Sequence, residues 1–401
     1  MATTATAPAP SVPIPRTYNI ATAYIDDLVT PDRAHRTASI HGDERVTCAA
    51  LRDRINRAGN AFRALGVEME QRVALLLPNQ PELVAAFFGA ATIGAVAAPM
   101  SAAVTASEQI FLLNDSRARA LVAAEPPWQT LRPRRGELPF LKHFLLVDGA
   151  PQAPDEHAWA ARTATAASEL AAAPITCDDT AFWRHTAGST GTPKWAVHLH
   201  RNVPHAEQGY ATPVIGLRPD DVRFASGPLS HAYPLGLATY FALRARATVV
   251  LHRERPTPAR VFDTIARYRV TVFAAVPTLY AQLLHAAEAG EPADFTSVRL
   301  CLSAAEPLPA DLYRRFRARF GVEVLDGIGT AEALHVFMSN RLGDVRPGSS
   351  GRPVPGYEVG LLDDGNEVSP GEEERHVLAR VFAEGGWILS REGRLPMPQD
   401  R

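Results

Sequence analysis

Apolar residues recur along the chain with helical spacing, and short apolar runs separate these stretches. Leu51, Ile55 and Phe62 recur at the spacing of an amphipathic helix, and Gly66 ends that helix. The next apolar run, residues 73–77, is closed by a proline, which is typical of a buried parallel strand. The pattern therefore predicts a helix packed against a buried strand.

The same alternation continues downstream. Further strands are predicted at residues 118–122, 142–147, 248–251, 270–275, 300–303 and 322–325, and further helices at residues 261–268, 280–287 and 312–320. Such alternation is typical of an α/β protein with mostly parallel sheets. After Gly343, short strands and Gly/Pro turns replace the alternation, which predicts a small β-rich region.

One uncharged stretch, residues 83–100, is long enough to be compared with a membrane-spanning helix. Seven of its residues are alanine, Gly89 and Gly94 interrupt it, and Pro99 ends it. These features favour a buried helix over residues 81–93 followed by a buried strand over residues 95–99.

Composition and charge narrow the class of protein. The net charge of −2 over 401 residues provides no general attraction to nucleic acid or to an anionic membrane. Three cysteines, Cys48, Cys177 and Cys301, lie far apart, so they predict neither a disulfide framework nor a metal site and fit a reducing cytoplasm. Residues 1–17 are rich in Ala and Pro, lack the pattern of a secretory signal and predict a flexible arm.

A loop rich in Gly, Ser and Thr ends on Lys194 within the run AFWRHTAGSTGTPKWAVHLH. Small residues let backbone N–H groups approach phosphate oxygens, and the lysine adds a point charge. The pattern favours the phosphates of a nucleoside triphosphate, with the loop between a strand and a helix; a surface turn without a ligand is the alternative. A Walker A loop is disfavoured because Pro193 precedes the lysine and Trp195 follows it.

Together with this loop, several separated segments resemble the adenylate-forming (ANL) superfamily, and most closely its benzoate/4-hydroxybenzoate–CoA ligases. The segments are INRAGNAFRALGVE, NDSRARALV, AFWRHTAGSTGTPK, ERPTPARVFDTIARYRVTVFAAVPTLYAQLL, LDGIGTAEALHVFMSNRLGDVRPGSSGRPVPGYEV and LLDDGNEV. The resemblance implies an α/β fold, the large N-terminal domain of an adenylate-forming enzyme, with two α/β lobes of mostly parallel sheets plus a small β-rich subdomain. The lobes are expected at residues 18–170 and 171–343, the subdomain at 344–371 and a divergent tail at 372–401.

The resemblance also implies a site for ATP and Mg²⁺. Catalytic roles are implied for Lys194, Glu332 and Thr190, with Glu332 as the metal ligand. The segment from Asp326 to Glu332 follows an apolar run, so we expect it on a loop at a strand end. The residues expected to bind the nucleotide are Thr186, Ser189, Thr190, Gly191, Thr192, Lys194, Ala304, Ala305, Glu306, Asp326, Gly327, Thr330 and Glu332.

An acyl pocket is implied by two further segments. Aromatic and aliphatic side chains can enclose an aromatic ring, and a histidine can contact its carboxylate or hydroxyl group. The small residues Ala232 and Gly329 favour a flat aromatic acid over a fatty chain. The residues expected in this pocket are His231, Ala232, Tyr233, Gly329, His335 and Val336.

Several positions depart from the family pattern. Trp195 replaces a glycine, Ala331 replaces a hydroxyl residue, and Ala305 stands where glycine is usual. Residues 372–401 contain no recognisable ribose-binding aspartate, hinge or catalytic lysine, so we expect the C-terminal lid domain to be absent from this chain.

The leading hypothesis is ATP-dependent activation of a benzoate-type acid to an acyl-adenylate, with CoA thioester formation in full-length relatives. We expect this chain alone to adenylate slowly unless a separate C-terminal domain or carrier completes it. Two alternatives remain: an impaired ATP- and aryl-acid-binding relative or partner protein, and an enzyme that activates a non-carboxylate substrate. No nucleic acid or membrane partner is expected, the location is expected to be cytoplasmic, and the oligomeric state is left open.

Overall fold

The structure is a computed structural model that describes residues 13–186, 193–363, 366–367, 376–381 and 387–390. Two compact units divide these residues. The N-terminal unit comprises Ile14–Val203 and Val222–Arg255. The C-terminal unit comprises Pro13, Pro204–Asp221 and the described residues from Pro256 onward. The lobe boundaries expected from the sequence remain predictions.

A seven-stranded sheet forms the larger part of the N-terminal unit, with strand order β7-β6-β5-β3-β4-β8-β9. All neighbours pair in parallel except β8 and β9, which are antiparallel. The strands are β3 (Arg72–Leu76), β4 (Val96–Pro99), β5 (Ala120–Ala123), β6 (His143–Leu146), β7 (Glu156–Ala158), β8 (Thr180–Thr186) and β9 (Lys194–Leu199).

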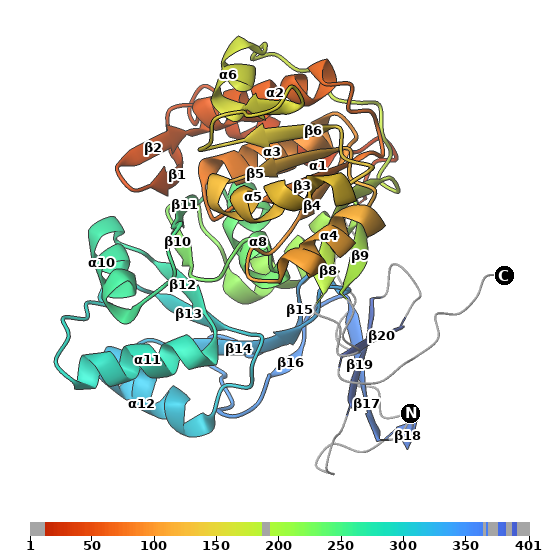
Figure 1. The fold of residues 1–401 in the computed structure, drawn as a ribbon. Coiled ribbons are helices and arrows are strands. Elements are labelled where there is room, and N and C mark those ends of the chain that lie inside the picture. The colour runs from red at the N-terminus through yellow and green to blue at the C-terminus, as the bar shows by residue number, and fades with distance from the viewer. Residues whose placement is uncertain (1–12, 187–192, 364–365, 368–375, 382–386, 391–401) are drawn as a thin grey trace. The chain divides into compact units, whose positions relative to one another are not determined.

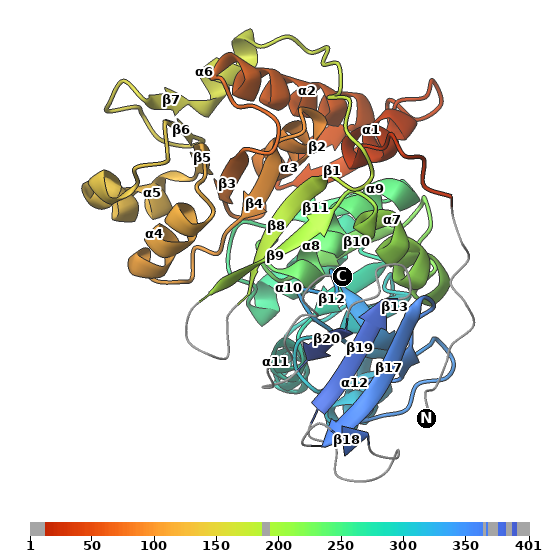
Figure 2. The ribbon, with the colours of Figure 1, turned by 90° about the vertical axis from the view of Figure 1, so that its right-hand side faces the viewer.

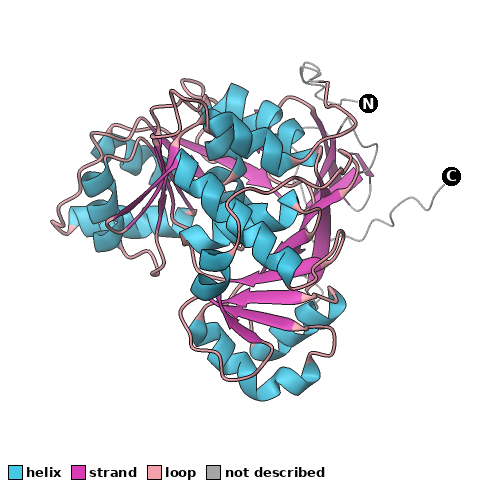
Figure 3. Cartoon of the chain, turned by 90° about the horizontal axis from the view of Figure 1, so that it is seen from above, coloured by secondary structure: helices cyan, strands magenta, loops and turns pink. Residues whose placement is uncertain are grey.

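Helices cover both faces of this sheet. Figure 2 shows α2 (Cys48–Ala64) and α3 (Pro81–Thr92) on one side of β3–β6, with α4 (Ala106–Asp115) and α5 (Glu125–Leu131) on the other. Figure 3 shows the strands between these helical layers. The predicted helices and strands of this region are confirmed, with ends that differ by a few residues.

The remaining elements of the N-terminal unit include a second set of paired strands. In this set β10, β11 and β1 pair in parallel and β2 is antiparallel to β1. These elements are α1 (Ile20–Ile25), η1 (Asp26–Leu28), β1 (Thr37–His41), β2 (Glu44–Thr47), η2 (Arg132–Glu137), α6 (Trp159–Thr165), β10 (Val222–Ala225), α8 (Ala232–Ala238), α9 (Tyr240–Ala245) and β11 (Thr248–Leu251). A short helix, α7 (Asn202–Ala206), follows β9 in the chain.

The C-terminal unit carries a second α/β layer. Its strands β12, β13 and β14 pair in parallel, and β15 and β16 continue the sheet as antiparallel strands. Figure 1 shows α11 and α12 side by side along these strands. Its elements are η3 (Glu207–Ile215), α10 (Pro258–Tyr268), β12 (Val272–Ala275), α11 (Pro277–Glu288), β13 (Leu300–Ser303), α12 (Ala310–Phe320), β14 (Val324–Gly329), β15 (Val336–Ser339) and β16 (Arg352–Pro353).

A four-stranded antiparallel sheet follows, in the order β18-β17-β19-β20. Its strands are β17 (Tyr357–Asp363), β18 (Asn366–Glu367), β19 (His376–Val381) and β20 (Trp387–Ser390). The β-rich region predicted after Gly343 is thus present, and its strands extend beyond residue 371.

Burial explains the uncharged stretch before Met100. Every residue of α3 except Glu82 is buried, and β4 is buried throughout. Gly59 and Gly89 let α2 and α3 approach closely, because a Cβ at Gly59 would lie 2.9 Å from the Gly89 carbonyl oxygen. The predicted buried helix and strand are confirmed. None of the helices in the described part of the chain combines the length and apolar character that a bilayer crossing needs.

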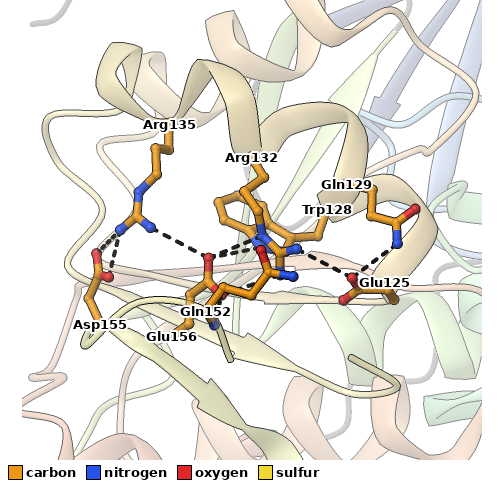
Figure 4. A network of polar contacts seen from close by, with 8 residues as sticks. All are labelled: Glu125, Trp128, Gln129, Arg132, Arg135, Gln152, Asp155 and Glu156. Carbon is orange, nitrogen blue, oxygen red and sulfur yellow. Dashed lines mark hydrogen bonds and ion pairs between the residues drawn. The ribbon is translucent and has the colours of Figure 1, made fainter. Parts of the chain in front are cut away.

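A buried carboxylate connects β7 to the segment of α5 and η2, as Figure 4 shows. The Glu156 side chain is fully buried and accepts hydrogen bonds from Trp128 Nε1 (3.3 Å), from the Arg132 guanidinium (3.3 Å) and from the Gln152 N–H (2.8 Å). Arg135 lies 3.5 Å from the same carboxylate and also pairs with Asp155. Glu156 thus lies between two guanidinium groups and stabilises this edge of the sheet.

Candidate active site

The predicted phosphate loop joins two antiparallel strands, so the expected order of strand, loop and helix is wrong. In the β8–β9 ladder Thr186 pairs with Lys194, which brings the two ends of the loop side by side. Thr186 is half-buried and Lys194 is exposed. Four predicted phosphate-binding residues lie outside the described part of the chain: Ser189, Thr190, Gly191 and Thr192.

Trp195, the departure beside Lys194, is packed inward. Its ring lies 6.1 Å from His185 in an edge-to-face arrangement and 6.1 Å from Trp183. It also packs against the apolar cluster that α4 and α5 form with β3, β5 and β6. An indole at this position therefore adds to the core of the N-terminal unit, which gives the departure a structural reason.

His185, which sequence reasoning missed, is a buried histidine that contacts Ser101 and His231. Its Nε2 accepts a hydrogen bond from the Ser101 N–H at 3.1 Å, and its ring lies 6.3 Å from that of His231. Burial, with Arg184 and His231, lowers the pKa of His185 to about 4. The imidazole is therefore neutral near pH 7, as its acceptor role requires.

The predicted acyl segment begins at His231 and continues into α8. His231 retains exposed surface, yet the protein atoms crowded around its ring and the nearby Arg184 lower its pKa. Asn79 fixes the preceding turn, since its side chain donates to the Gly227 carbonyl at 2.9 Å and accepts from the Leu229 N–H at 2.7 Å. Ala232 and Tyr233 follow as half-buried residues in the first turn of α8.

In the C-terminal unit, the predicted adenine segment leaves the end of β13. Ala304 is buried, and Ala305 is exposed with φ of 79°, a left-handed conformation that an L-alanine adopts only with strain. The Glu306 carboxylate accepts from both the backbone N–H and the hydroxyl of Thr278, at 3.2 and 2.6 Å. Glu306 thus holds the segment to the first turn of α11.

Asp326 closes the same segment from β14. Its carboxylate accepts from the Ser303 hydroxyl at 2.7 Å and from the Leu308 N–H at 3.4 Å, so it joins the two ends of the segment. Burial raises the pKa of Asp326 to about 6, although the hydrogen bonds from Ser303, Leu308 and Gly327 oppose the shift. Its role in the structure is to position residues 304–307.

The motif that begins at Asp326 is only partly a loop. Asp326, Gly327 and Gly329 lie within β14, so the expectation that the whole motif follows a strand end is wrong; Thr330 and Glu332 follow the strand. Gly329 pairs with Val336 across the β14–β15 hairpin, and a Cβ at Gly329 would lie 2.3 Å from the His335 carbonyl oxygen. Only glycine permits this approach.

In the turn of this hairpin, the Thr330 side chain bonds the backbone and the Glu332 side chain faces solvent. The Thr330 hydroxyl accepts a hydrogen bond from the Ala333 N–H at 3.0 Å, so it stabilises the turn. Glu332 is exposed. Leu334 has φ of 68°, and the chain then turns inward to the buried residues His335 and Val336.

His335 packs against an aromatic residue that sequence reasoning also missed. Tyr210, from η3, has its ring centroid 5.2 Å from that of His335 with the planes tilted by 35°. The exposed fractions of Tyr210 and His335 are 1% and 2%. A single tyrosine in the run GYATPVIG carries no periodic signal, which is why the pattern did not reveal it.

The predicted residues therefore form local groups in each unit. The N-terminal unit contains Thr186 opposite Lys194, and the segment from His231 to Tyr233. In the C-terminal unit Asp326 bonds Ser303 and Leu308, which flank Ala304, Ala305 and Glu306, and Gly329 lies beside His335 and Val336.

The metal site predicted from the sequence rests on one carboxylate, that of Glu332. Among residues 13–186, 193–363 and the short described segments beyond, no group of three or more His, Cys, Asp or Glu side chains could hold a metal by itself. Mg²⁺ usually keeps several waters and binds one or two carboxylates together with substrate phosphates. A single exposed carboxylate at Glu332 matches that chemistry.

Known proteins match most of the chain. The protein family described as AMP-binding enzyme matches residues 29–375 of this chain. A benzoate–CoA ligase of Thauera aromatica is 40% identical over 362 residues, which cover 90% of this chain and 68% of that protein. A 4-hydroxybenzoate–CoA/benzoate–CoA ligase of Rhodopseudomonas palustris is 36% identical, with coverage of 92% and 68%.

Solved structures agree with these matches. The anthranilate CoA ligase AuaEII, in complex with anthranoyl-AMP, superposes with a TM-score of 0.87 at 34% identity, covering 92% of this chain and 70% of that one. A benzoate CoA ligase from Burkholderia xenovorans LB400 superposes with a TM-score of 0.83 at 35% identity, covering 91% and 71%.

Proposed function

Because the chain belongs to the AMP-binding enzyme family, we propose that it activates an aromatic carboxylic acid of the benzoate type with ATP. The observation that carries the substrate class is the β14–β15 hairpin. It sets Gly329 opposite Val336 and directs the buried His335 against Tyr210, in a chain 40% identical to a benzoate–CoA ligase. Small and partly aromatic residues of this kind suit a flat ring.

The first half-reaction forms an acyl-adenylate. A carboxylate oxygen of the acid attacks the α-phosphorus of ATP, the bond to the bridging oxygen breaks, and pyrophosphate leaves. Catalysis consists mainly of positioning and charge neutralisation. Lys194 holds the β- and γ-phosphates together with Thr186, Ser189, Thr190, Gly191 and Thr192, and Thr190 donates to them. Residues 304–306 pack against adenine.

Magnesium, when bound, neutralises charge on the phosphates, and Glu332 is the residue of this chain proposed to hold it. Asp326 keeps the adenine segment closed through Ser303 and Leu308. Gly327 and Thr330 shape the turn that presents Glu332, since the Thr330 hydroxyl accepts from Ala333. We propose acid-binding roles for His231, Ala232 and Tyr233 as well.

The second half-reaction transfers the acyl group to CoA. The thiolate sulfur attacks the carbonyl carbon of the adenylate, a thioester forms, and AMP leaves. The matched residues amount to 68% of the Thauera ligase. A C-terminal domain or a carrier is our proposed partner for this step. We also propose that the reaction takes place in the cytoplasm.

The test is pyrophosphate release with ATP, Mg²⁺ and a panel of benzoates. We expect release that depends on one acid, and a loss of roughly 10²–10³-fold in rate in Lys194→Ala, because a preorganised charge is removed. Lys142→Ala is the matched control: Lys142 is the other lysine of the chain, and its exposed ammonium group donates to the Pro139 carbonyl.

Two outcomes would contradict the proposal. Binding of ATP by calorimetry without pyrophosphate release for any acid would indicate a nucleotide-binding protein without ligase activity. Release that depends on an acid other than a carboxylate would indicate a different substrate class.

A further inference from the structure

The segment that carries Tyr210 has an unusual backbone. Residues Glu207–Ile215 form a π-helix with Pro213 inside it, and the segment ends at Gly216 with φ of 58°. The Thr212 hydroxyl donates to the Glu207 carboxylate at 2.6 Å, so a side-chain bond spans the same five-residue interval as a π-helical turn. π-Helical turns are usually single and occur often at functional sites, so a nine-residue stretch directs attention to what it positions.

Close backbone packing fixes this segment. A Cβ at Gly209 would lie 2.6 Å from the Pro355 carbonyl oxygen, so only glycine allows η3 to lie this close to the 354–355 turn. The same turn is bonded to the strand that carries Val336, because the Val354 N–H donates to the Phe337 carbonyl at 2.8 Å. The backbone of η3 is thereby held at a set distance from β15.

Tyr210 follows Gly209 in this segment and contacts His335. Tyr210 presents its ring to the His335 imidazole at 5.2 Å, and both side chains are buried. The turn before His335 is held separately, since the Tyr357 hydroxyl donates to the Ala333 carbonyl at 3.0 Å. The backbone near His335 is thus fixed by β14 and Tyr357, while Tyr210 covers the ring itself.

We propose that Tyr210 is a positioning residue that sets the orientation of the His335 ring and, through it, the ring substituents that the acyl pocket accepts. This inference rests on the proposed function for its substrate. A histidine side chain can rotate about two bonds. A flat aromatic ring packed against one face of the imidazole limits this rotation. Without the tyrosine ring, His335 has space to turn, and the contact with the acid is no longer pre-arranged.

The kinetic test compares Tyr210→Leu with Tyr210→Phe, which keeps the ring. In Tyr210→Leu we expect the KM for benzoate to rise roughly ten- to a hundredfold, with the KM for ATP unchanged. The preference between benzoate and 4-hydroxybenzoate should shift by about tenfold. Tyr210→Phe should restore the KM for the acid to within about threefold of the wild-type value.

A double mutant tests the route of the effect. If Tyr210 acts through His335, then adding Tyr210→Leu to His335→Ala should change the preference between the two acids no further. Tyr313→Leu is the control for loss of a buried tyrosine in the same unit, because Tyr313 on α12 is 3% exposed and outside the predicted site. Additive effects, or equal changes in the KM for acid and for ATP, would overturn the inference.

A spectroscopic measurement separates this inference from the proposed function. The ring protons of His335, assigned with His335→Ala, should show a ring-current shift that Tyr210→Phe keeps and that Tyr210→Leu loses. An unchanged His335 signal in folded Tyr210→Leu rejects the positioning role, whatever the enzyme activates. If no acid causes release of pyrophosphate from ATP, the proposed function is rejected, and with it the role of Tyr210 in acid selectivity.

Discussion

Two buried carboxylates, Glu156 in the scaffold and Asp326 near the proposed site, have different partners. Glu156, at the edge of the seven-stranded sheet, is surrounded by Arg132, Arg135 and the indole N–H of Trp128. Asp326, which bonds the two ends of residues 303–308, accepts from a hydroxyl group and from backbone N–H groups, all uncharged. Burial consequently raises the pKa of Asp326 to about 6.

Whether a buried carboxylate has a cation beside it depends on its place in the structure and not on which unit contains it. Asp221, in the same unit as Asp326, is also buried, but Arg299 contacts both of its oxygens at 2.6 and 2.8 Å. Burial opposes ionisation of Asp221, yet Arg299, Thr271 and the Arg218 N–H together lower its pKa. A carboxylate that only stabilises the fold can have a cation beside it.

The largest expected effect concerns the scaffold carboxylate. Glu156→Ala should lower the free energy of unfolding by about 3–5 kcal/mol, because two guanidinium groups and an indole N–H lose their shared partner in a buried place. Urea denaturation of the wild-type protein and the variant measures this loss.

Glu137→Ala is the matched control for Glu156→Ala. Glu137 makes two hydrogen bonds to Arg134 in water-exposed surroundings, and its side chain is 51% exposed. We expect a much smaller loss, because solvent screens the pair. Equal losses in the two variants would show that burial does not set the difference.

The next effect is the pH dependence of stability due to Asp326. Its folded pKa of about 6 exceeds the usual value of 3.8, so between these values the folded state binds more protons than the unfolded state. Stability from this group is therefore present at low pH and lost as pH rises through about 6. Between pH 4.5 and 7.5 the wild-type protein should lose about 2 kcal/mol relative to Asp326→Asn.

Denaturation curves at the two pH values measure this difference, in which other titrating groups cancel. Asp311→Asn serves as the control, since the Asp311 side chain is 76% exposed and keeps its water on folding. If the free energies of unfolding of the wild-type protein and Asp326→Asn change equally with pH, the prediction that burial raises the pKa of Asp326 is wrong.

The smallest effect concerns the strained residue above Asp326. Ala305→Gly should raise the free energy of unfolding by about 0.5–1 kcal/mol, because glycine relieves the left-handed strain and loses part of this gain through its more flexible unfolded state. Ala304→Gly, one residue earlier and with ordinary φ, should instead destabilise by about 1 kcal/mol. Thermal unfolding compares the two, and the same sign for both would contradict the strain at Ala305.

Local patterns predicted the elements well because the signal lies within each element. Helical spacing through Leu51, Ile55 and Phe62 corresponds to α2, and the run after Gly94 corresponds to β4. The phosphate loop was misplaced because the residues after Lys194 look like neither a clear strand nor a clear helix. Only pairing with β8 makes them a strand. The extent of β14 was underestimated for the same reason, since Gly327 and Gly329 have low strand propensity and are held by β15.

The sequence by itself determined the order of helices and strands, the family, and the residue types available for phosphate, metal and ring binding, because each is written in local spacing or in motifs. Only the tertiary structure decided that Asp326 joins Ser303 to Leu308, that Gly329 faces His335 and that Tyr210 covers the His335 ring. These contacts join residues far apart in the chain. They depend on strand pairing, close backbone approach and burial, and no local pattern encodes these.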